Sequence, residues 1–235
     1  MTRHVVGLRR RFGPSYVNTR ISALRSFFRW AVTQRPPLPG IGRRDPTVDL
    51  KMRKEYPPPR APLSAPELRA LVRAAATPLE RAAIMVLLDT ALRRSEFLAL
   101  RESDVDWHDG TILVRQGKGG RFRLVAPGRR ALAALGELRN GGGPSAPLWH
   151  LSKSGIKRLL DGVGERAGLP LGTVYPHRLR VTRICDLIEG GVGELVAGTV
   201  AGHSLEMVRY YTRAIAQRRA VDTMRRHSLA DRIAG

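Results

Sequence analysis

The stretch Thr111-Ile-Leu-Val-Arg-Gln-Gly-Lys-Gly-Gly-Arg-Phe-Arg-Leu-Val125 decides the fold class of this 235-residue chain. Two short runs of β-favouring residues, 111–114 and 121–125, flank a glycine-rich turn at 116–120. This pattern predicts an antiparallel hairpin with Lys118 at its tip. Because helical patterns lie on both sides of the hairpin, we expect a mainly α protein with a small antiparallel β-sheet.

Capping boxes mark the start of two helices before the hairpin. Ser64 precedes Glu67 by three residues, Thr77 precedes Glu80 in the same way, and apolar residues at helical spacing follow each pair. These signals predict helices over 65–76 and 78–91. Beyond the hairpin the same periodicity predicts helices over 128–139, 152–167 and 177–189, and then shorter helical pieces to the C-terminus.

The first quarter of the chain is a concentrated basic module. Residues 1–60 carry 14 basic and 3 acidic residues, about half of the chain's net charge of +21. Apolar residues recur every three or four positions from 17 to 32 and predict one amphipathic basic helix. The proline-rich stretch 35–62 predicts an extended connector. We therefore expect a shortened N-terminal segment at 1–60 and a larger domain at 61–235.

Charge and composition narrow the class of partner. A net charge of +21 favours a polyanion, and nucleic acid such as double-stranded DNA is the leading candidate. The longest purely apolar run, 82–88, is too short to span a bilayer, and the N-terminus lacks the pattern of a secretory signal. The lone Cys185 excludes an internal disulfide and predicts a buried helical residue. We expect a cytoplasmic, nucleoid-associated prokaryotic protein that makes no contact with membranes.

Five short motifs contain residue types suited to phosphate chemistry. Each alone has an ordinary structural explanation, such as a helix-end arginine, a solvated hairpin lysine, a turn histidine or a packed tyrosine. Their order along the chain is more informative than any single motif. They are Leu92-Arg-Arg-Ser-Glu96, Gly117-Lys-Gly-Gly120, His177-Arg-Leu-Arg180, Gly202-His-Ser204 and Tyr210-Tyr211.

In this order the motifs closely resemble the catalytic domain of the tyrosine recombinases, the phage integrase and Xer-like family. The resemblance covers residues 62–213, and residues 20–32 resemble a helix of the family's core-DNA-binding domain. It implies a tyrosine-recombinase catalytic domain at 61–235, preceded by a short helical DNA-binding segment and connector at 1–60. The function it implies is site-specific DNA recombination, by cleavage and rejoining through a 3′-phosphotyrosyl intermediate.

The resemblance also assigns roles to single residues. Two arginines would neutralise the charge that develops on the non-bridging phosphate oxygens. A phenol with a pKa of about 10 needs a base and nearby positive charge before it can attack, and the departing 5′ oxygen needs a proton. The assigned residues are Arg93 and Arg180 as phosphate clamps, Lys118 as proton donor, His177 as proton acceptor, His203 as hydrogen-bond donor to the phosphate and Tyr211 as nucleophile.

The implied reaction requires no cofactor, because the phosphotyrosyl bond conserves the energy of the phosphodiester. The sequence contains no Walker-type loop, no clustered carboxylates for magnesium and no dinucleotide fingerprint, so we expect neither cofactor nor metal. Two cuts on each of two duplexes need four tyrosines, which predicts a homotetramer on DNA. Apolar positions after Ile215 are candidates for linking the subunits or for packing on their own domain: Val221, Met224, Leu229 and Ile233.

Two alternatives stay open at this stage. The interval from His203 to Tyr211 is one residue shorter than is usual in the family, so Tyr210 competes with Tyr211 as the nucleophile. The short interval and the shortened N-terminal segment also permit a non-cleaving DNA-binding relative of the recombinases. A type IB topoisomerase would use related chemistry without site preference. Integration, excision and resolution are not distinguished by the sequence.

Overall fold

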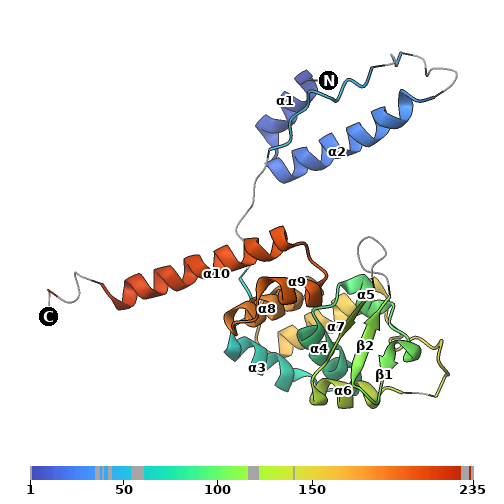
Figure 1. Ribbon diagram of the computed structural model, residues 1–235, viewed down its shortest axis with the longest axis vertical. Helices are drawn as coiled ribbons and strands as arrows, with labels where there is room; N and C mark the ends of the chain where they lie inside the picture. The colour runs from blue at the N-terminus through green and yellow to red at the C-terminus, as the bar shows by residue number, and fades with distance from the viewer. Residues whose placement is uncertain are drawn as a thin grey trace. The chain divides into compact units, whose positions relative to one another are not determined.

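The structure is a computed structural model that describes residues 2–34, 38, 40–41, 44–53, 61–115, 122–139, 141–228 and 233. The chain forms two compact units, Met1–Pro58 and Pro59–Gly235 (Figure 1). Helices dominate both units, and one three-stranded antiparallel sheet lies in the second, so the expected fold class is confirmed. Within the described residues, no helix has the length and apolar character needed to cross a bilayer.

The first unit contains two helices, α1 (Thr2–Arg11) and α2 (Pro14–Ala31). Their small core consists of Val5, Val17, Ile21 and Leu50, and Leu8 packs against it. The sequence analysis expected one helix here and was wrong. Only two of the ten residues of α1 reach this core, which is too few to produce a recognisable helical repeat.

The second unit is built around α4 (Pro78–Thr90), whose side chains from Ala82 to Leu87 are almost all buried. Helices α3 (Ala65–Ala74), α6 (Arg129–Gly136), α7 (Lys153–Arg166) and α8 (Pro176–Glu189) pack against α4. Both predicted capping boxes are present. The hydroxyls of Ser64 and Thr77 accept hydrogen bonds from the amides three residues later, and the glutamates at those positions accept from the cap amides.

The sheet confirms the two strands of the predicted hairpin. Strand β2 (Thr111–Val114) pairs with β3 (Arg123–Val125), and β1 (Val105–Asp106) joins the other edge of β2. Residues 116–121 connect β2 to β3, and Lys118 lies there, outside the described residues. In β3 the side chains of Arg123 and Val125 are buried while Leu124 is exposed.

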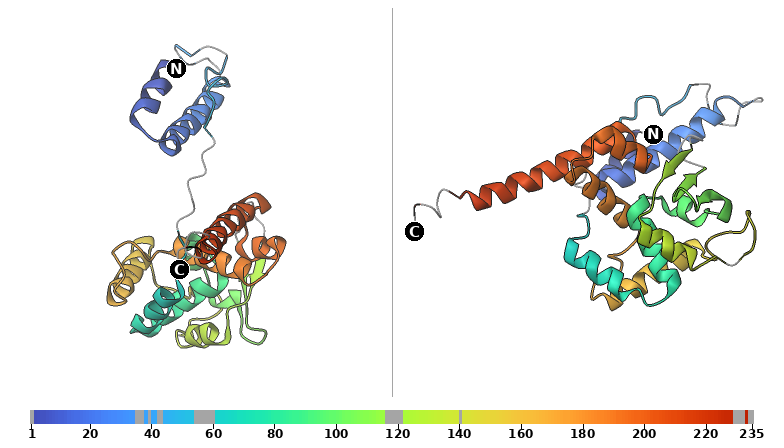
Figure 2. Two further views of the ribbon diagram at one scale, coloured as in Figure 1. Left: turned by 90° about the vertical axis from the view of Figure 1, so that its left-hand side faces the viewer. Right: turned by 60° about the horizontal axis from the view of Figure 1, so that its bottom comes forward.

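Three helices at the C-terminal end form a second apolar cluster. Helices α8, α9 (Glu194–Ala201) and α10 (Leu205–Arg226) contribute Val181, Ile184, Cys185, Ala201, Tyr211 and Ile215. The burial of Cys185 on a helix agrees with the sequence-based expectation. Instead of several short pieces, one 22-residue helix follows His203, because no glycine or proline interrupts residues 205–226. Its C-terminal part projects away from the other helices of this unit (Figures 1 and 2).

The turn after α4 contains a strained residue. Ala91 has φ 50° and is the only non-glycine residue with positive φ in the described part of the chain. This turn directs the chain into α5 (Arg94–Leu98), whose N-cap is Arg93. We expect Ala91→Gly to raise the free energy of unfolding by about 0.5–1 kcal/mol, since glycine adopts this conformation without steric cost. Urea denaturation of both proteins tests this, and a less stable variant would contradict it.

Candidate active site

Arg93 is held at the start of α5 by its own helix. Its backbone amide donates to Oε2 of Glu96 at 2.8 Å, and its Nη1 donates to Oε1 of the same carboxylate at 2.6 Å. Its Nη2 donates to the carbonyl of Gly202, in the turn between α9 and α10. The side chain is 27% exposed, so Arg93 remains accessible to a ligand from solution.

Arg180 is the most deeply buried arginine of the site, with 2% of its side chain exposed. Its Nη1 donates to the carbonyl of Ala91 at 2.5 Å, its Nη2 donates to the carbonyl of Ala201, and its Nε donates to Nε2 of His203 at 3.2 Å. Burial and the neighbouring charge of Arg93 lower the pKa of Arg180 to about 10, which still leaves it charged at pH 7.

Glu96 is the carboxylate that joins the arginines of the site. It is 3% exposed and binds Arg123 through both oxygens, at 3.1 Å from Nη1 and 2.7 Å from Nη2. Arg93 contacts the same carboxylate, and Nη1 of Arg180 lies 3.9 Å from it. Burial alone would raise the pKa of Glu96, but the hydrogen bonds from Arg123 and Arg93 lower it to about 2.

His203 follows α9 and lies beside Arg180. Burial and the charges of Arg180 and Arg93 lower its pKa to about 3, so the imidazole is neutral at physiological pH. Because Nε2 accepts the hydrogen bond from Arg180, the proton of the neutral ring lies on Nδ1. His203 can therefore donate one hydrogen bond to a phosphate, but as a neutral ring it contributes no positive charge.

Tyr211 lies on α10 with its ring 6.1 Å from the ring of His203, measured between centroids. It is 3% exposed and packs in the second apolar cluster. Burial raises the pKa of the Tyr211 hydroxyl, and the charge of Arg180 partly opposes this. The adjacent Tyr210 is only partly buried and packs against the same cluster. Of the two tyrosines, Tyr211 therefore lies beside His203 and within the electrostatic influence of Arg180.

Of the two remaining predicted site residues, the structure describes His177 but not Lys118. His177 is exposed in the first turn of α8, and when protonated it disfavours protonation of His203. Lys118 belongs to the segment that is not described, so its position stays a prediction. In the described ranges, no group of three His, Cys, Asp or Glu side chains is arranged to hold a metal ion.

Two residues of the charged cluster formed by Arg93, Glu96, Arg123 and Arg180 received no role in the sequence analysis. Glu96 was quoted only as part of a motif, and Arg123 was not singled out. The strand alternation carried a signal, because Arg123 shares a face with the apolar Val125 across one intervening residue. A charged residue on the buried face of a strand needs a partner, and Glu96 is that partner.

The pKa of Glu96 leads to a prediction for acid stability. Its pKa is about 2 in the folded chain and 4.5 as an isolated group, so its contribution is complete above pH 4.5 and is lost as the pH falls toward 2. The difference in free energy of unfolding between the wild type and Glu96→Gln should therefore shrink by about 3 kcal/mol over this range. Chemical denaturation at pH 7, 5, 4, 3 and 2 measures the difference. A constant difference would contradict the assignment.

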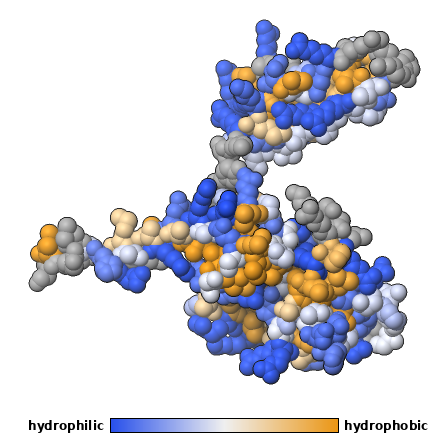
Figure 3. All heavy atoms as spheres, in the orientation of Figure 1, coloured by the Kyte–Doolittle hydropathy of each residue, from blue (hydrophilic) through white to orange (hydrophobic). Residues whose placement is uncertain are grey.

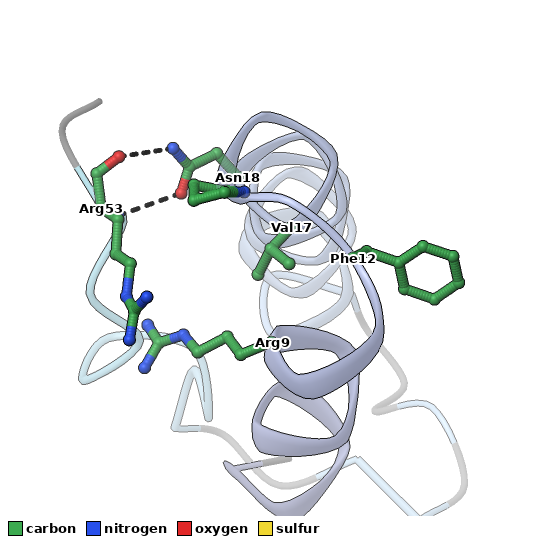
Figure 4. Close-up of a pocket in the computed structure, with 6 residues that line it drawn as sticks. Arg9, Phe12, Val17, Asn18 and Arg53 are labelled. Atoms are coloured by element: carbon green, nitrogen blue, oxygen red, sulfur yellow. Dashed lines mark hydrogen bonds between the residues drawn. The ribbon is translucent and has the colours of Figure 1, made fainter. Parts of the chain in front are cut away.

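The first unit offers a basic and aromatic surface. The guanidinium of Arg20 stacks over the ring of Tyr16 at 4.9 Å, and that of Arg11 lies 5.7 Å from the ring of Phe12. Figure 4 shows the guanidinium ends of Arg9 and Arg53 facing each other beside a small pocket. No carboxylate within the described residues forms an ion pair with either of these two arginines. Two converging cations of this kind suit a phosphate group.

The comparisons with known proteins agree on one family. The phage integrase family profile matches residues 62–218. Tyrosine recombinase XerD of Brucella suis is 31% identical over 249 residues, which cover 94% of this chain and 78% of that protein. Tyrosine recombinase XerD of Mycobacterium tuberculosis is 35% identical over 147 residues, or 56% of this chain and 47% of the relative. That match therefore spans about half the length of the mycobacterial protein.

Solved structures show the same fold. The crystal structure of XerA recombinase aligns with a TM-score of 0.59 and 23% identity, covering 97% of this chain and 82% of that one. The Tn1549 transposon integrase in complex with transposon right end DNA aligns with a TM-score of 0.66 and 17% identity. The alignment covers 93% of this chain and 84% of that one. At sequence identities this low, the structural similarity establishes a shared fold only.

Proposed function

The chain belongs to the phage integrase family, and we propose from this that it is a tyrosine-type site-specific recombinase, which cleaves and rejoins DNA through a 3′-phosphotyrosyl intermediate. The observation that carries the proposal is the convergence of Arg93, Arg180, His203 and Tyr211, which come from separate helices and turns. Integration, excision and resolution all use this chemistry, so the proposal covers any of them.

The arginines and His203 would stabilise the transition state. Attack on a phosphodiester places negative charge on the non-bridging oxygens of a pentacoordinate phosphorus. Arg93 and Arg180 supply two permanent positive charges there, and their planar guanidinium groups match the geometry of phosphate oxygens. The Nδ1–H of His203 adds a neutral hydrogen bond. Arg93 is 27% exposed and accessible as it stands, whereas Arg180, at 2%, must be uncovered as DNA binds.

Two protons move in the cleavage step. The Tyr211 hydroxyl oxygen bonds to phosphorus and loses its proton, for which His177 is the proposed acceptor. The bond from phosphorus to the 5′ oxygen breaks, and Lys118 is the proposed donor of the proton that this oxygen takes up. A hydroxyl with a pKa near 10 is about 4 kcal/mol from ionisation at pH 7, and burial increases the deficit. The positive charge of Arg180 and the proton acceptor would offset it.

Cleavage also requires Tyr211 to move. A side chain that is 3% exposed and packed among apolar residues cannot reach the backbone of duplex DNA. The cluster that holds it is small, with Val181, Ile184 and Ile215 among its members. We propose that binding of DNA shifts α10 and delivers Tyr211 to the phosphate between the arginines.

The burial of Tyr211 is also the observation that favours the second candidate, a DNA-binding relative that does not cleave. One experiment separates the two. Nicked suicide duplexes taken from the DNA that flanks the gene are incubated with the protein, and covalent protein–DNA species are resolved under denaturing conditions. A covalent adduct supports the recombinase. Binding to the same duplexes without any adduct supports the second candidate, and relaxation of plasmids of unrelated sequence would indicate a topoisomerase.

An apolar surface supports the proposed assembly on DNA. Figure 3 shows hydrophobic residues gathered over α9 and the first turns of α10, and the exposed ones include Leu195, Val196, Leu205 and Met207. On the projecting part of α10, Val221 and Met224 are 47% and 73% exposed. Leu229 lies outside the described residues. Exposed apolar side chains of this kind suit a contact between subunits, as the sequence analysis expected for a homotetramer.

Removal of the C-terminal segment tests this assembly. We expect a chain that ends at residue 216 to bind a single DNA site with unchanged affinity and to lose the complex that pairs two sites. Ile215, which packs in the second cluster, stays in the shortened chain, so the fold around Tyr211 is retained. Electrophoretic mobility shift and analytical ultracentrifugation measure the two steps. Full recombination by the shortened chain would refute this role.

A further inference from the structure

Arg123 lies in the interior of the charged cluster around Glu96 and faces away from solvent. Its side chain is 8% exposed, two of its nitrogens bind both oxygens of Glu96, and its Nε donates to the carbonyl of Val200 at 2.9 Å. All three nitrogens of the guanidinium are therefore engaged within the protein. Both terminal nitrogens of Arg123 bind a carboxylate, whereas those of Arg180 donate to the neutral carbonyls of Ala91 and Ala201. The charge of Arg123 is therefore paired inside the protein.

The balance of charge in the cluster depends on Arg123. Three guanidinium groups surround one carboxylate, because Arg93, Arg123 and Arg180 all approach Glu96 and the neighbouring His203 is neutral. Buried charges interact strongly, since little water screens them. If Arg123 were absent, Glu96 would have only Arg93 and Arg180 as partners. A phosphate would then compete with Glu96 for the same two guanidinium groups.

Arg123 also contacts the turn that carries His203. The carbonyl of Val200 lies in the last turn of α9, and a Cβ added at Gly202 would lie 3.0 Å from Nη1 of Arg123. Strand β3 is thereby tied to the turn between α9 and α10. The same turn supplies the carbonyls of Ala201 and Gly202 that orient Arg180 and Arg93.

We propose that Arg123 is a positioning residue of the active site: it satisfies Glu96 on both oxygens and holds the turn after α9, so that Arg93 and Arg180 stay directed at the DNA phosphate. Arg123 acts through these groups and does not touch the substrate. The inference rests on the proposed recombinase function, because the phosphate it refers to is that of the cleaved DNA.

The rate of DNA cleavage by the Arg123→Gln variant tests the inference. We expect single-turnover cleavage of the suicide duplex to fall by about tenfold or more at saturating protein, with the dissociation constant for DNA changed less than about twofold. Arg123→Lys keeps the charge but not the two-pronged contact, so its loss should be smaller. If Arg123→Gln does not fold, the lysine variant provides the measurement. A wild-type cleavage rate in the variant that folds would overturn the proposal.

Removing the carboxylate as well separates positioning from general loss of structure. In Arg123→Gln/Glu96→Gln no buried anion competes for Arg93 and Arg180, so the double variant should cleave faster than Arg123→Gln alone. A purely structural role predicts the opposite, since two buried pairs are then lost. Arg115→Gln is the matched control, because Arg115 follows β2 and pairs with the buried carboxylate of Asp104. It should cleave at the wild-type rate.

A second measurement does not depend on cleavage. Long-range ¹H–¹⁵N correlation spectra of the free protein at pH 7 report which nitrogen of His203 carries the proton. We expect Nδ1–H in the wild type and in the double variant, and loss of this fixed tautomer in Arg123→Gln, where Glu96 draws Arg180 away from Nε2. An unchanged tautomer would overturn the proposal. If even the wild type forms no adduct, the proposed function fails, and the tautomer alone decides the inference.

Discussion

Tyr211→Phe is expected to abolish the covalent protein–DNA adduct completely, because phenylalanine has no oxygen that can bond to phosphorus. The prediction follows from the placement of the Tyr211 ring beside His203 and within the influence of Arg180. The measurement is the yield of denaturation-resistant complex on a suicide duplex. Affinity for uncleaved DNA should change little, because the substitution removes one hydroxyl and leaves the basic side chains that would bind the DNA backbone unaltered.

Tyr210→Phe is the matched control, since it removes the same atom from the neighbouring residue. Adjacent residues on a helix point about 100° apart, so Tyr210 and Tyr211 cannot both face the arginine pocket. We expect Tyr210→Phe to keep the adduct. The reverse pattern, with the adduct lost only in Tyr210→Phe, would transfer the nucleophile to Tyr210 and imply that the shortened turn after His203 rotates α10.

Arg93→Lys is expected to lower the rate of cleavage by about 10² or more, with a much smaller effect on DNA binding. Lysine keeps the charge, but it cannot hold Glu96, the carbonyl of Gly202 and a phosphate with one planar group. The same loss is expected for Arg180→Lys, which in addition leaves the carbonyls of Ala91 and Ala201 without their buried donor. Arg93→Lys is therefore the cleaner variant.

Single-turnover cleavage and equilibrium DNA binding, measured on the same duplex, separate the two effects. Arg183→Lys serves as the control on α8, because Arg183 bonds to the carbonyl of Asp89 and to Asp186 instead of Glu96. Its cleavage rate should remain within about twofold of the wild type, as expected for a partly exposed ion pair. Equal losses of binding and cleavage in Arg93→Lys would reject its role in the transition state.

Local sequence signals predicted most of the second unit. Capping boxes at Ser64 and Thr77, and the glycine-rich turn before β3, act over three to five residues, so the residues that define them are visible together in the sequence. The order of the motifs indicated the family, and the comparisons confirm it. Elements with few apolar contacts were predicted less well. Helix α1 was missed, the five-residue helix α5 was not predicted, and α10 was expected to be broken.

The sequence by itself therefore determined the fold class, the starts of the helices at 65 and 78, the two strands of the hairpin and the residue types available for phosphate chemistry. Only the tertiary structure decided how they meet. Arg93 reaches the carbonyl of Gly202 across 109 residues, Arg180 reaches Ala91 across 89, and Arg123 reaches Glu96 across 27. Such contacts depend on how the helices around α4 pack, because local spacing fixes the direction of a side chain only relative to its own helix or strand. The alternation in β3 placed Arg123 and Val125 on one face, but the packing of α5 and α9 made that face the interior of the candidate active site.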